Sequence, residues 1–314
     1  MGVGFYFEQD WQGARAWARY CAGLAARGES AEFSSFIPPA VGDAENLATT
    51  PFLAAIFPDR TGGGQGPRDL ERLDRVRGLA VTCGAASALV RSSGPPRTNS
   101  WARTPLDLPA WYLAFNEATK SLPSGDGFLL TGFTQQEAAS DILTALSETD
   151  PVFAELREAS QRPFCRFDLD YANPNPSEIR VPHWDVLDCL CQVLRLRASA
   201  ELALSESQEA CEEVKLMLRL TDAHRTEADV YSQLRRFVRL QFAIEPLASG
   251  LAAHRWTEAQ LKALQEQLQG FNFVSDGRRA LQCQCTMIAP LLTVSRFHRL
   301  SWARPGSDPP ASAV

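Results

Sequence analysis

Residues 183–204, HWDVLDCLCQVLRLRASAELAL, indicate the fold class of this chain most clearly. The apolar residues of this stretch recur at helical spacing, and this pattern predicts a helix of about six turns. Four more helical patterns follow before residue 300. The sequence therefore predicts a mainly α fold in which residues 161–300 form an α-solenoid-like array of long antiparallel helices.

Pairs of polar residues mark the starts of the later helices. The pairs lie three positions apart and are Ser205 with Gln208, Thr226 with Asp229, and Thr257 with Gln260. Gly270 is expected to end the fourth helix. We expect Pro246 to kink or end the third helix, and Pro290 to interrupt or bend the fifth, which covers residues 276–300.

Two short segments suggest that the array is repetitive. VLRL at residues 193–196 and FVRL at residues 237–240 lie 44 positions apart. An alanine-rich turn and a second, capped helix follow each of them. Helix pairs at such a spacing are typical of stacked helical repeats, although about three copies are usually needed for a stable stack.

The third helix carries both an apolar stripe and a cluster of arginines. We expect the apolar stripe to face the core, and it includes Leu234, Phe237, Val238 and Phe242. Arg235, Arg236 and Arg239 then form an exposed basic surface. That surface is either simply solvated or a patch for nucleic acid or anionic lipid. The net charge of −6 favours the first interpretation, so no nucleic-acid partner is expected.

The first half of the chain, residues 1–160, is predicted to be an irregular helical region. A proline- and glycine-rich arm spans residues 28–67 within it. The predicted helices cover residues 10–27, 69–77 with a continuation to 90, 108–122, 135–146 with Thr134 and Glu137 as its capping box, and a segment opened by Asp150 and Pro151. Residues 301–314 are expected to be a disordered tail. The two halves are separate regions or one continuous globular unit.

Asp168, Asp170 and His183 are the candidates for an enzyme site. Apolar and charged residues alternate over residues 165–171, which is typical of a strand or an isolated extended segment. Side chains two positions apart on such a segment share a face at about 7 Å, so the two aspartates can bind a divalent cation in a metal-dependent hydrolase. The plainer interpretation is a solvent-facing edge with Arg166 as ion-pair partner. We favour it, and therefore expect no catalytic residue, metal or cofactor.

The eight cysteines are expected to be reduced and mostly packed in the core. A chain of this length needs no disulfide framework, and cysteine within a helical pattern behaves as a small apolar residue. A redox pair between neighbouring helices is the alternative. Among the histidines, His224 lies near a predicted helix end, where the helix dipole favours a charged imidazolium.

Two stretches resemble an uncharacterised bacterial family of mostly helical proteins. The first is WQGARAW at residues 11–17, which leads to IPPAV at 37–41 and ENLATTP at 45–51; the second is the helical block 187–273. The resemblance implies no catalytic residue. Members of the family often begin with a membrane anchor, and this chain opens without an apolar span. We expect it to be soluble as given, or anchored and extracytoplasmic if the true start lies upstream.

Composition narrows the function further. The chain has 314 residues, of which 45% are hydrophobic and 22% charged, which excludes collagen-like, disordered and channel classes. With no catalytic motif, the sequence favours a non-enzymatic scaffold or protein-interaction protein whose partner is another protein. The family resemblance adds an expected place at the cell envelope.

Overall fold

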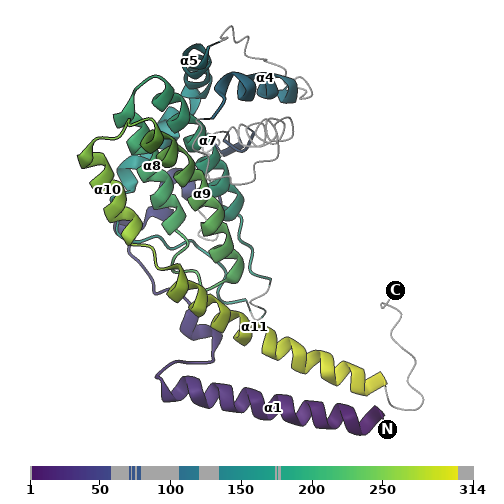
Figure 1. The fold of residues 1–314 in the computed structure, drawn as a ribbon. Helices are drawn as coiled ribbons and strands as arrows, with labels where there is room; N and C mark the ends of the chain where they lie inside the picture. The colour runs from purple at the N-terminus through teal and green to yellow at the C-terminus, as the bar shows by residue number, and fades with distance from the viewer. Residues whose placement is uncertain are drawn as a thin grey trace.

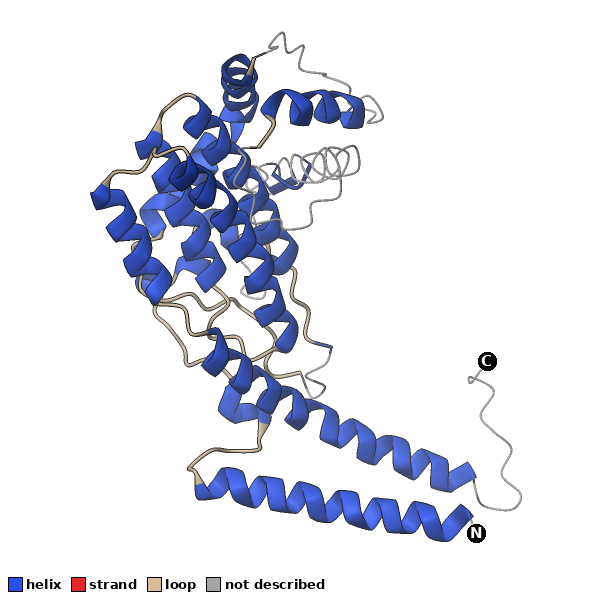
Figure 2. Ribbon diagram, viewed as in Figure 1, coloured by secondary structure: helices blue, strands red, loops and turns tan. Residues whose placement is uncertain are grey.

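The computed structural model is all-helical in the part of the chain that it describes (Figure 1, Figure 2). That part comprises residues 2–57, 106–119, 134–173 and 178–302, together with residues 71, 73, 74, 76–78 and 175. No strand is present in these ranges, where the sheet-like pairing is an isolated parallel bridge between Asn46 and Phe164. The predicted mainly α fold is confirmed.

Five long helices form the array in the C-terminal half. They are α7 (His183–Ala203), α8 (Ser207–Asp222), α9 (Val230–Ala252), α10 (Glu258–Gln269) and α11 (Phe273–Trp302). Helices α7, α8 and α9 pack on one another, α10 packs on α8, and α11 packs on α9. The two segments of the predicted repeat lie in α7 and α9, which are in direct contact. Their arrangement as a solenoid stays a prediction.

Short-range hydrogen bonds set the starts of two helices as predicted. At α10 the Thr257 hydroxyl accepts from the Gln260 N–H at 3.3 Å, and the Gln260 side chain accepts from the Thr257 N–H at 2.8 Å. Helix α5 (Gln135–Leu146) begins with the same box between Thr134 and Glu137. Both boxes were predictable because the partners are three residues apart and need no tertiary contact.

The predicted cap of Ser205 with Gln208 is wrong, because Ser205 ends α7 instead of starting α8. Its φ is +68°, in the left-handed region. The Ser205 N–H donates to the carbonyl of Leu202 at 3.2 Å, and the Glu206 N–H donates to that of Glu201 at 2.8 Å. These two bonds form a Schellman motif, which satisfies carbonyls at a helix C-terminus.

Of three further expectations about helix limits, the cap at Thr226 is wrong. At Pro246 and Pro290 an ended or interrupted helix is excluded, and a kink or bend stays a prediction. Asp229, and not Thr226, caps α9, since its carboxylate accepts from the Ser232 N–H at 3.0 Å. Pro246 lies inside α9 without ending it. Helix α11 continues through Pro290 to Trp302 as one helix.

Short helices and turns of the N-terminal half pack onto the array. They are η1 (Phe33–Phe36), η2 (Asp43–Glu45), η3 (Leu47–Thr49), α2 (Pro51–Ala54), α4 (Leu108–Thr119), η4 (Ser147–Thr149) and α6 (Asp150–Ala159), besides α5. Helix α5 packs against α7, and α4 packs against α5. One hydrophobic cluster contains both Leu47 from the N-terminal half of the chain and Leu264 from the C-terminal half. The core therefore crosses the predicted boundary at residue 160.

Some predicted elements fall partly outside the described residues. The proline-rich arm is described as far as residue 57, and there Phe36, Leu53 and Ile56 are buried. The described residues between 71 and 78 are helical, and the rest of the predicted helix to residue 90 lies outside. The predicted tail lies outside from residue 303 onward.

Residues 165–171 form an extended segment on the helices, which is one of the two predicted alternatives. Cys165, Phe167 and Leu169 are buried, whereas Asp168 is exposed. The Asn46 side chain anchors the segment, because its amide donates to the carbonyl of residue 166 at 2.9 Å and its oxygen accepts from the N–H of that residue at 2.8 Å. The Asn46 side chain thus makes the two backbone hydrogen bonds that a neighbouring strand would otherwise make.

Helix α1 (Gly2–Ala26) starts earlier than the predicted residue 10 and lies away from the array (Figure 1). Most of the described side chains of α1 are exposed, and the exposed fractions of Trp11 and Trp17 are 58% and 36%. Its C-terminal end is held to α11, because Glu29 accepts from Arg278 at 3.0 Å and from Gln282 at 2.8 Å. Figure 1 shows α1 running along the outlying half of α11.

The cysteines in the described part of the chain are all free. Four of them are buried: Cys165, Cys191, Cys211 and Cys283. Burial raises the pKa of Cys165, Cys191 and Cys283 to about 12, so these thiols stay protonated and behave as packing groups. No helix in the described ranges combines the length and the hydropathy that a membrane span requires.

Candidate functional site

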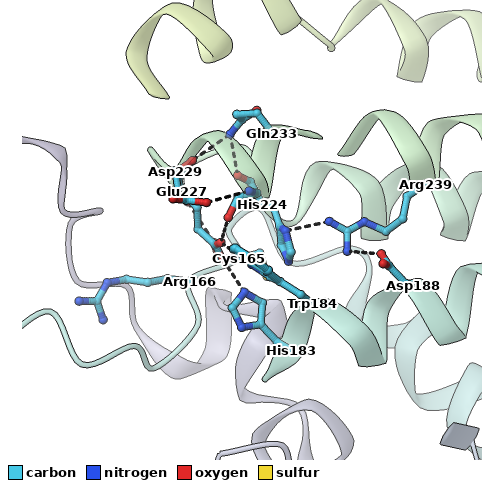
Figure 3. A network of polar contacts seen from close by, with 12 residues as sticks. Cys165, Arg166, His183, Trp184, Asp188, His224, Glu227, Asp229, Gln233 and Arg239 are labelled. Carbon is cyan, nitrogen blue, oxygen red and sulfur yellow. Dashed lines mark hydrogen bonds and ion pairs between the residues drawn. The ribbon is translucent and has the colours of Figure 1, made fainter. Parts of the chain in front are cut away.

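A buried polar network lies where α7 begins and the chain turns from α8 into α9 (Figure 3). Nε2 of His183, the first residue of α7, donates to Oε1 of Glu227 at 2.9 Å. The other oxygen of Glu227 accepts from the Ser232 hydroxyl at 2.7 Å and from the Trp184 indole at 3.4 Å. Because both carboxylate oxygens have donors, the network can hold a charge away from water.

The network keeps Glu227 ionised. Burial alone raises the pKa of this carboxyl, but the attraction of His183 and the hydrogen bonds from His183, Ser232 and Trp184 outweigh burial and lower it. Since the carboxylate form is favoured in the folded state, its contribution to stability is present at neutral pH. It is lost as the pH falls through the lowered pKa.

His224, the second histidine of the network, is neutral. Arg239 Nη2 lies 2.8 Å from His224 Nδ1, and a guanidinium only donates, so Nδ1 carries the lone pair and Nε2 the proton. Burial, followed by the charges of Arg239 and His183, holds the pKa of His224 well below its usual value. The expectation of an imidazolium at a helix end is therefore wrong, because the ring is removed from water beside an arginine.

Aromatic contacts fix the orientation of both imidazoles. Phe167 stacks on His183 with ring centroids 4.1 Å apart, and His224 meets His183 edge-on with ring centroids 4.8 Å apart. His224 also stands edge-on to Phe167 at 5.7 Å. Phe167 comes from the extended segment 165–171. The alternation of buried and exposed residues along that segment therefore brings its ring into contact with both imidazoles.

The arginines of α9 do not form the predicted basic surface. Arg236 and Arg239 are fully buried, and the side chain of Arg235 is 35% exposed. Their partners are aspartates of other helices: Asp185 and Asp188 for Arg235, Asp222 and Asp276 for Arg236, and Asp188 for Arg239. The prediction fails because a buried guanidinium is tolerated when carboxylates pair with it, and α7, α8 and α11 supply them.

The apolar stripe of α9 is correspondingly on the outside. We call Tyr231, Leu234, Phe237 and Val238 the outer face; they are 62%, 54%, 47% and 44% exposed. The buried face carries small and polar residues: Ser232, Gln233, Arg236, Arg239, Ala243, Pro246, Ser249 and Gly250. The expectation that the apolar stripe packs inward is wrong for Leu234, Phe237 and Val238, whereas Phe242 is half-buried and packs against the core. Over residues 231–239, α9 is therefore inverted relative to an ordinary amphipathic helix.

His183, His224 and Glu227 are close enough together to be tested as a metal centre. One ligand atom from each lies within 4.8 Å of the others, and two imidazoles with a carboxylate suit zinc. A metal-bound histidine donates its second N–H to an acceptor. At His224 the relation is reversed, since Arg239 donates to Nδ1 and leaves a proton on Nε2. In this arrangement the lone pair of His224 Nδ1 is taken by Arg239, while His183 Nδ1 and His224 Nε2 are buried without a hydrogen-bond partner among the described residues.

A pocket of about 310 Å³ lies beside the network. Its walls come from η1, from the segment after residue 168, from the starts of α7 and α9, and from α11. Five aromatic side chains line it, and we call it the aromatic pocket: Phe33, Phe36, Tyr171, Trp184 and Tyr231. Glu227 of the network and Tyr231 of the outer face both reach it, so the three features adjoin one another.

The structure separates the three predicted enzyme candidates. His183 is fully buried in the network, Asp168 is exposed, and Asp170 is half-buried. The group of potential metal ligands formed by the described residues contains His183 but neither aspartate. Among the described residues, the group of potential ligands within 4.8 Å of one another thus pairs His183 with His224 and Glu227 instead.

Sequence reasoning missed Glu227 entirely and misassigned Asp229. Glu227 lies in a short turn whose contacts to His183 span 44 positions, and no local pattern indicates such a pair. Asp229 did carry a signal, since an aspartate directly before a helical run is a preferred N-cap. The competing pair with Thr226 concealed it.

Comparisons with protein-family models, with curated proteins and with solved structures give no match to this chain. The class is therefore defined by the fold and the site alone. It is an all-helical array with a buried network of paired charges, an adjoining aromatic pocket and an exposed apolar helix face.

Proposed function

We propose that this chain is a non-enzymatic protein-interaction protein and that the outer face of α9 is where its protein partner docks. The inversion of α9 carries the proposal. Four large apolar side chains on successive turns stay exposed while two arginines of the same helix are buried and paired. Contiguous exposed apolar patches of this kind mark interaction surfaces.

The charges around the outer face favour a protein over a membrane or a nucleic acid. Helices that bind at a membrane surface present lysine and arginine beside their apolar face, and nucleic-acid binding needs unpaired basic groups. The arginines of α9 are instead directed inward or paired with aspartates. What remains outside is apolar and aromatic, the composition of interface cores.

The family resemblance adds the expectation that this interaction takes place at the cell envelope. The rival proposal, a metal-dependent hydrolase using Asp168, Asp170 and His183, has no comparable geometric support. Its two aspartates lie outside the cluster that holds the histidine.

Site-specific photocrosslinking tests the proposal. Benzoyl-phenylalanine in place of Leu234 is expected to give one discrete crosslinked species on irradiation in cells. Leu113 of α4 is the matched control, since it is an exposed leucine on another helix at 65% exposure. A species formed from position 234, absent from position 113 and abolished by Phe237→Asp supports docking at the outer face.

The same experiment can overturn the proposal. No crosslink at position 234, or the same products from both positions, would remove the outer face as a docking surface. A crosslinked species with twice the mass of the chain identifies the partner as a second copy. Sedimentation of the purified protein then has to show a dimer that Phe237→Asp dissociates.

A further inference from the structure

Among the polar groups on the wall of the aromatic pocket, the Ser232 hydroxyl and the Trp184 indole already donate to Glu227, and the tyrosine hydroxyls can both donate and accept. Glu227 and Asp229 contribute carboxylates, and Gln284 of α11 contributes an amide. No lysine or arginine is part of this wall as described. The wall thus offers negative charge and lone pairs to whatever occupies the pocket.

Two of these acceptors are incompletely paired: Gln284 has no hydrogen-bond donor for its oxygen, and Asp229 has no cation beside it among the described residues. The Oε1 atom of Gln284 is buried and has no hydrogen-bond partner among the described residues, which is costly for a polar atom unless a ligand or water pairs with it. The Asp229 carboxylate accepts from backbone N–H groups at the start of α9. No ion pair neutralises it in the described part of the chain. Glu227, in contrast, already has His183.

The remaining walls are apolar and aromatic. Leu169, Ile179, Val181 and Met287 face the same pocket as the five rings. The faces of aromatic rings attract cations. Tyr171 and Trp184 already lie beneath the guanidinium groups of Arg166 and Arg235, at 5.6 and 5.5 Å. We therefore assign the ring contribution to Phe33, Phe36 and Tyr231.

From this arrangement we propose that the aromatic pocket binds a small organic cation, namely a primary ammonium group carried on an apolar chain or ring. The ammonium N–H groups donate to Gln284 Oε1 and to the Asp229 carboxylate. The apolar part of the ligand lies against the aromatic and aliphatic walls. The volume of about 310 Å³ is at the lower end of small-molecule sites, which range over about 300–1,000 Å³.

An anion is the competing ligand, because the pocket adjoins the N-terminus of α9, where the helix dipole is positive. That N-terminus is already occupied. The carboxylate of Asp229 accepts from the Ser232 N–H at 3.0 Å, and Glu227 accepts from the Ser232 hydroxyl at 2.7 Å. An anionic ligand would meet two carboxylates and find no cation in the described wall.

Titration calorimetry with three probes of equal chain length tests the ligand class. Hexylammonium is expected to bind the full chain about tenfold or more tightly than 1-hexanol, because a charged donor to these acceptors outweighs a neutral one by about that factor. Hexanoate is expected to bind more weakly than either. Equal or tighter binding of hexanol or hexanoate would overturn the proposal.

Matched variants locate the binding site. Asp229→Asn keeps an N-cap residue but removes the charge, and it is expected to weaken hexylammonium binding about tenfold while leaving hexanol unchanged. Asp107→Asn is its control, since Asp107 caps α4 in the same way, accepting from the Ala110 N–H at 3.0 Å. Equal effects of the two variants would contradict the proposal.

Gln284→Leu provides a second test of the binding site, and this test does not alter a helix N-cap. It removes the unpaired buried oxygen, so the melting temperature is expected to stay the same or rise while hexylammonium binding falls. Gln265→Leu, at an exposed position of α10, is expected to leave binding unchanged. Unaltered hexylammonium affinity in Gln284→Leu would show that this amide does not face the ligand and would overturn the proposed geometry.

Discussion

Helices α8 and α9 pack against each other, yet they are built in opposite ways. Helix α8 buries its apolar residues, among them Val214, Met217 and Leu218, at 0% exposure. Helix α9 buries Arg236 and Arg239, also at 0%, and leaves Leu234 54% and Phe237 47% exposed. Hydrophobic burial holds the first helix in place, and paired charges contributed by three other helices hold the second.

The orientation of a helix in the array therefore depends on its charged partners as well as on hydrophobicity. A buried ion pair is costly unless its geometry is good, and breaking it costs more than never having made it. The paired charges of α9 therefore specify which face of the helix packs against the array. Their consequence is an apolar face that is left for another molecule.

The largest expected effect is the loss of a buried charge. Arg236→Ala leaves Asp276 and Asp222 without their buried partner and is expected to destabilise the fold by about 3–5 kcal/mol. Arg235→Ala removes a 35% exposed arginine and is expected to cost less than about 1 kcal/mol. Urea unfolding measures both values. Equal small costs would mean that Arg236 is not buried and paired.

The same substitution is expected to have different effects on the two helices. Leu218→Ala on α8 creates a cavity and is expected to cost about 2–5 kcal/mol. Leu234→Ala on α9 changes a side chain that is 54% exposed and is expected to alter stability by less than about 0.5 kcal/mol. A large cost at position 234 in the isolated protein would show that the apolar face of α9 packs inward.

A third effect concerns Glu201, a buried carboxyl of α7. Burial and then the charge of Glu213 raise its pKa from 4.5 to about 8. A raised pKa means that the folded state prefers the protonated form, so stability is full below about pH 4.5 and falls as the pH rises to about 8. Thermal unfolding across this window is expected to show the fall in the parent protein. It is expected to show a smaller fall in Glu201→Gln, and parallel profiles would contradict the assignment.

The smallest effect is at the end of α7. Ser205 holds a φ of +68°, a conformation that glycine adopts without strain, so Ser205→Gly is expected to raise stability by up to about 1 kcal/mol. Ser199→Gly, inside the same helix, is expected to lower it by about 1 kcal/mol. A loss of stability at position 205 would mean that this residue caps α8 instead.

The elements that sequence could predict are those decided within one or two turns of chain. Thr134 with Glu137 and Thr257 with Gln260 make their bonds three residues away, and the helices they start were predicted correctly. The orientation of α9 could not be predicted in this way. Its arginines depend on Asp188, Asp222 and Asp276, which lie 14 to 51 positions away along the chain.

One sequence pattern in α9 does indicate which face is buried. Ser232, Arg236, Arg239, Ala243, Pro246 and Gly250 recur at alternating intervals of four and three, as a buried stripe does, and all are buried. Two stripes on one helix therefore competed, and hydrophobicity selected the wrong one. The small residues explain why the polar stripe packs: a Cβ added at Gly250 would lie 2.3 Å from the Trp256 ring, so the chain approaches closely there.

The candidate site was predictable only in part. His183 was singled out, but its partners Glu227 and His224 join it through tertiary packing, and the aspartates chosen for it lie elsewhere. The aromatic pocket is assembled from η1, α7, α9 and α11. No spacing within one segment indicates a site whose walls come from so many separate parts of the chain.

Hydroxyl-radical footprinting of the monomeric protein tests the inversion of α9 most directly. Side-chain oxidation, read by mass spectrometry, compares Leu234 and Phe237 of α9 with Leu218 of α8 and with exposed Leu113 of α4. Relative to the intrinsic reactivity of each side chain, Leu234 and Phe237 are expected to be oxidised at rates close to that of Leu113, while Leu218 is protected. Protection of Leu234 and Phe237 to the level of Leu218 would contradict the inversion.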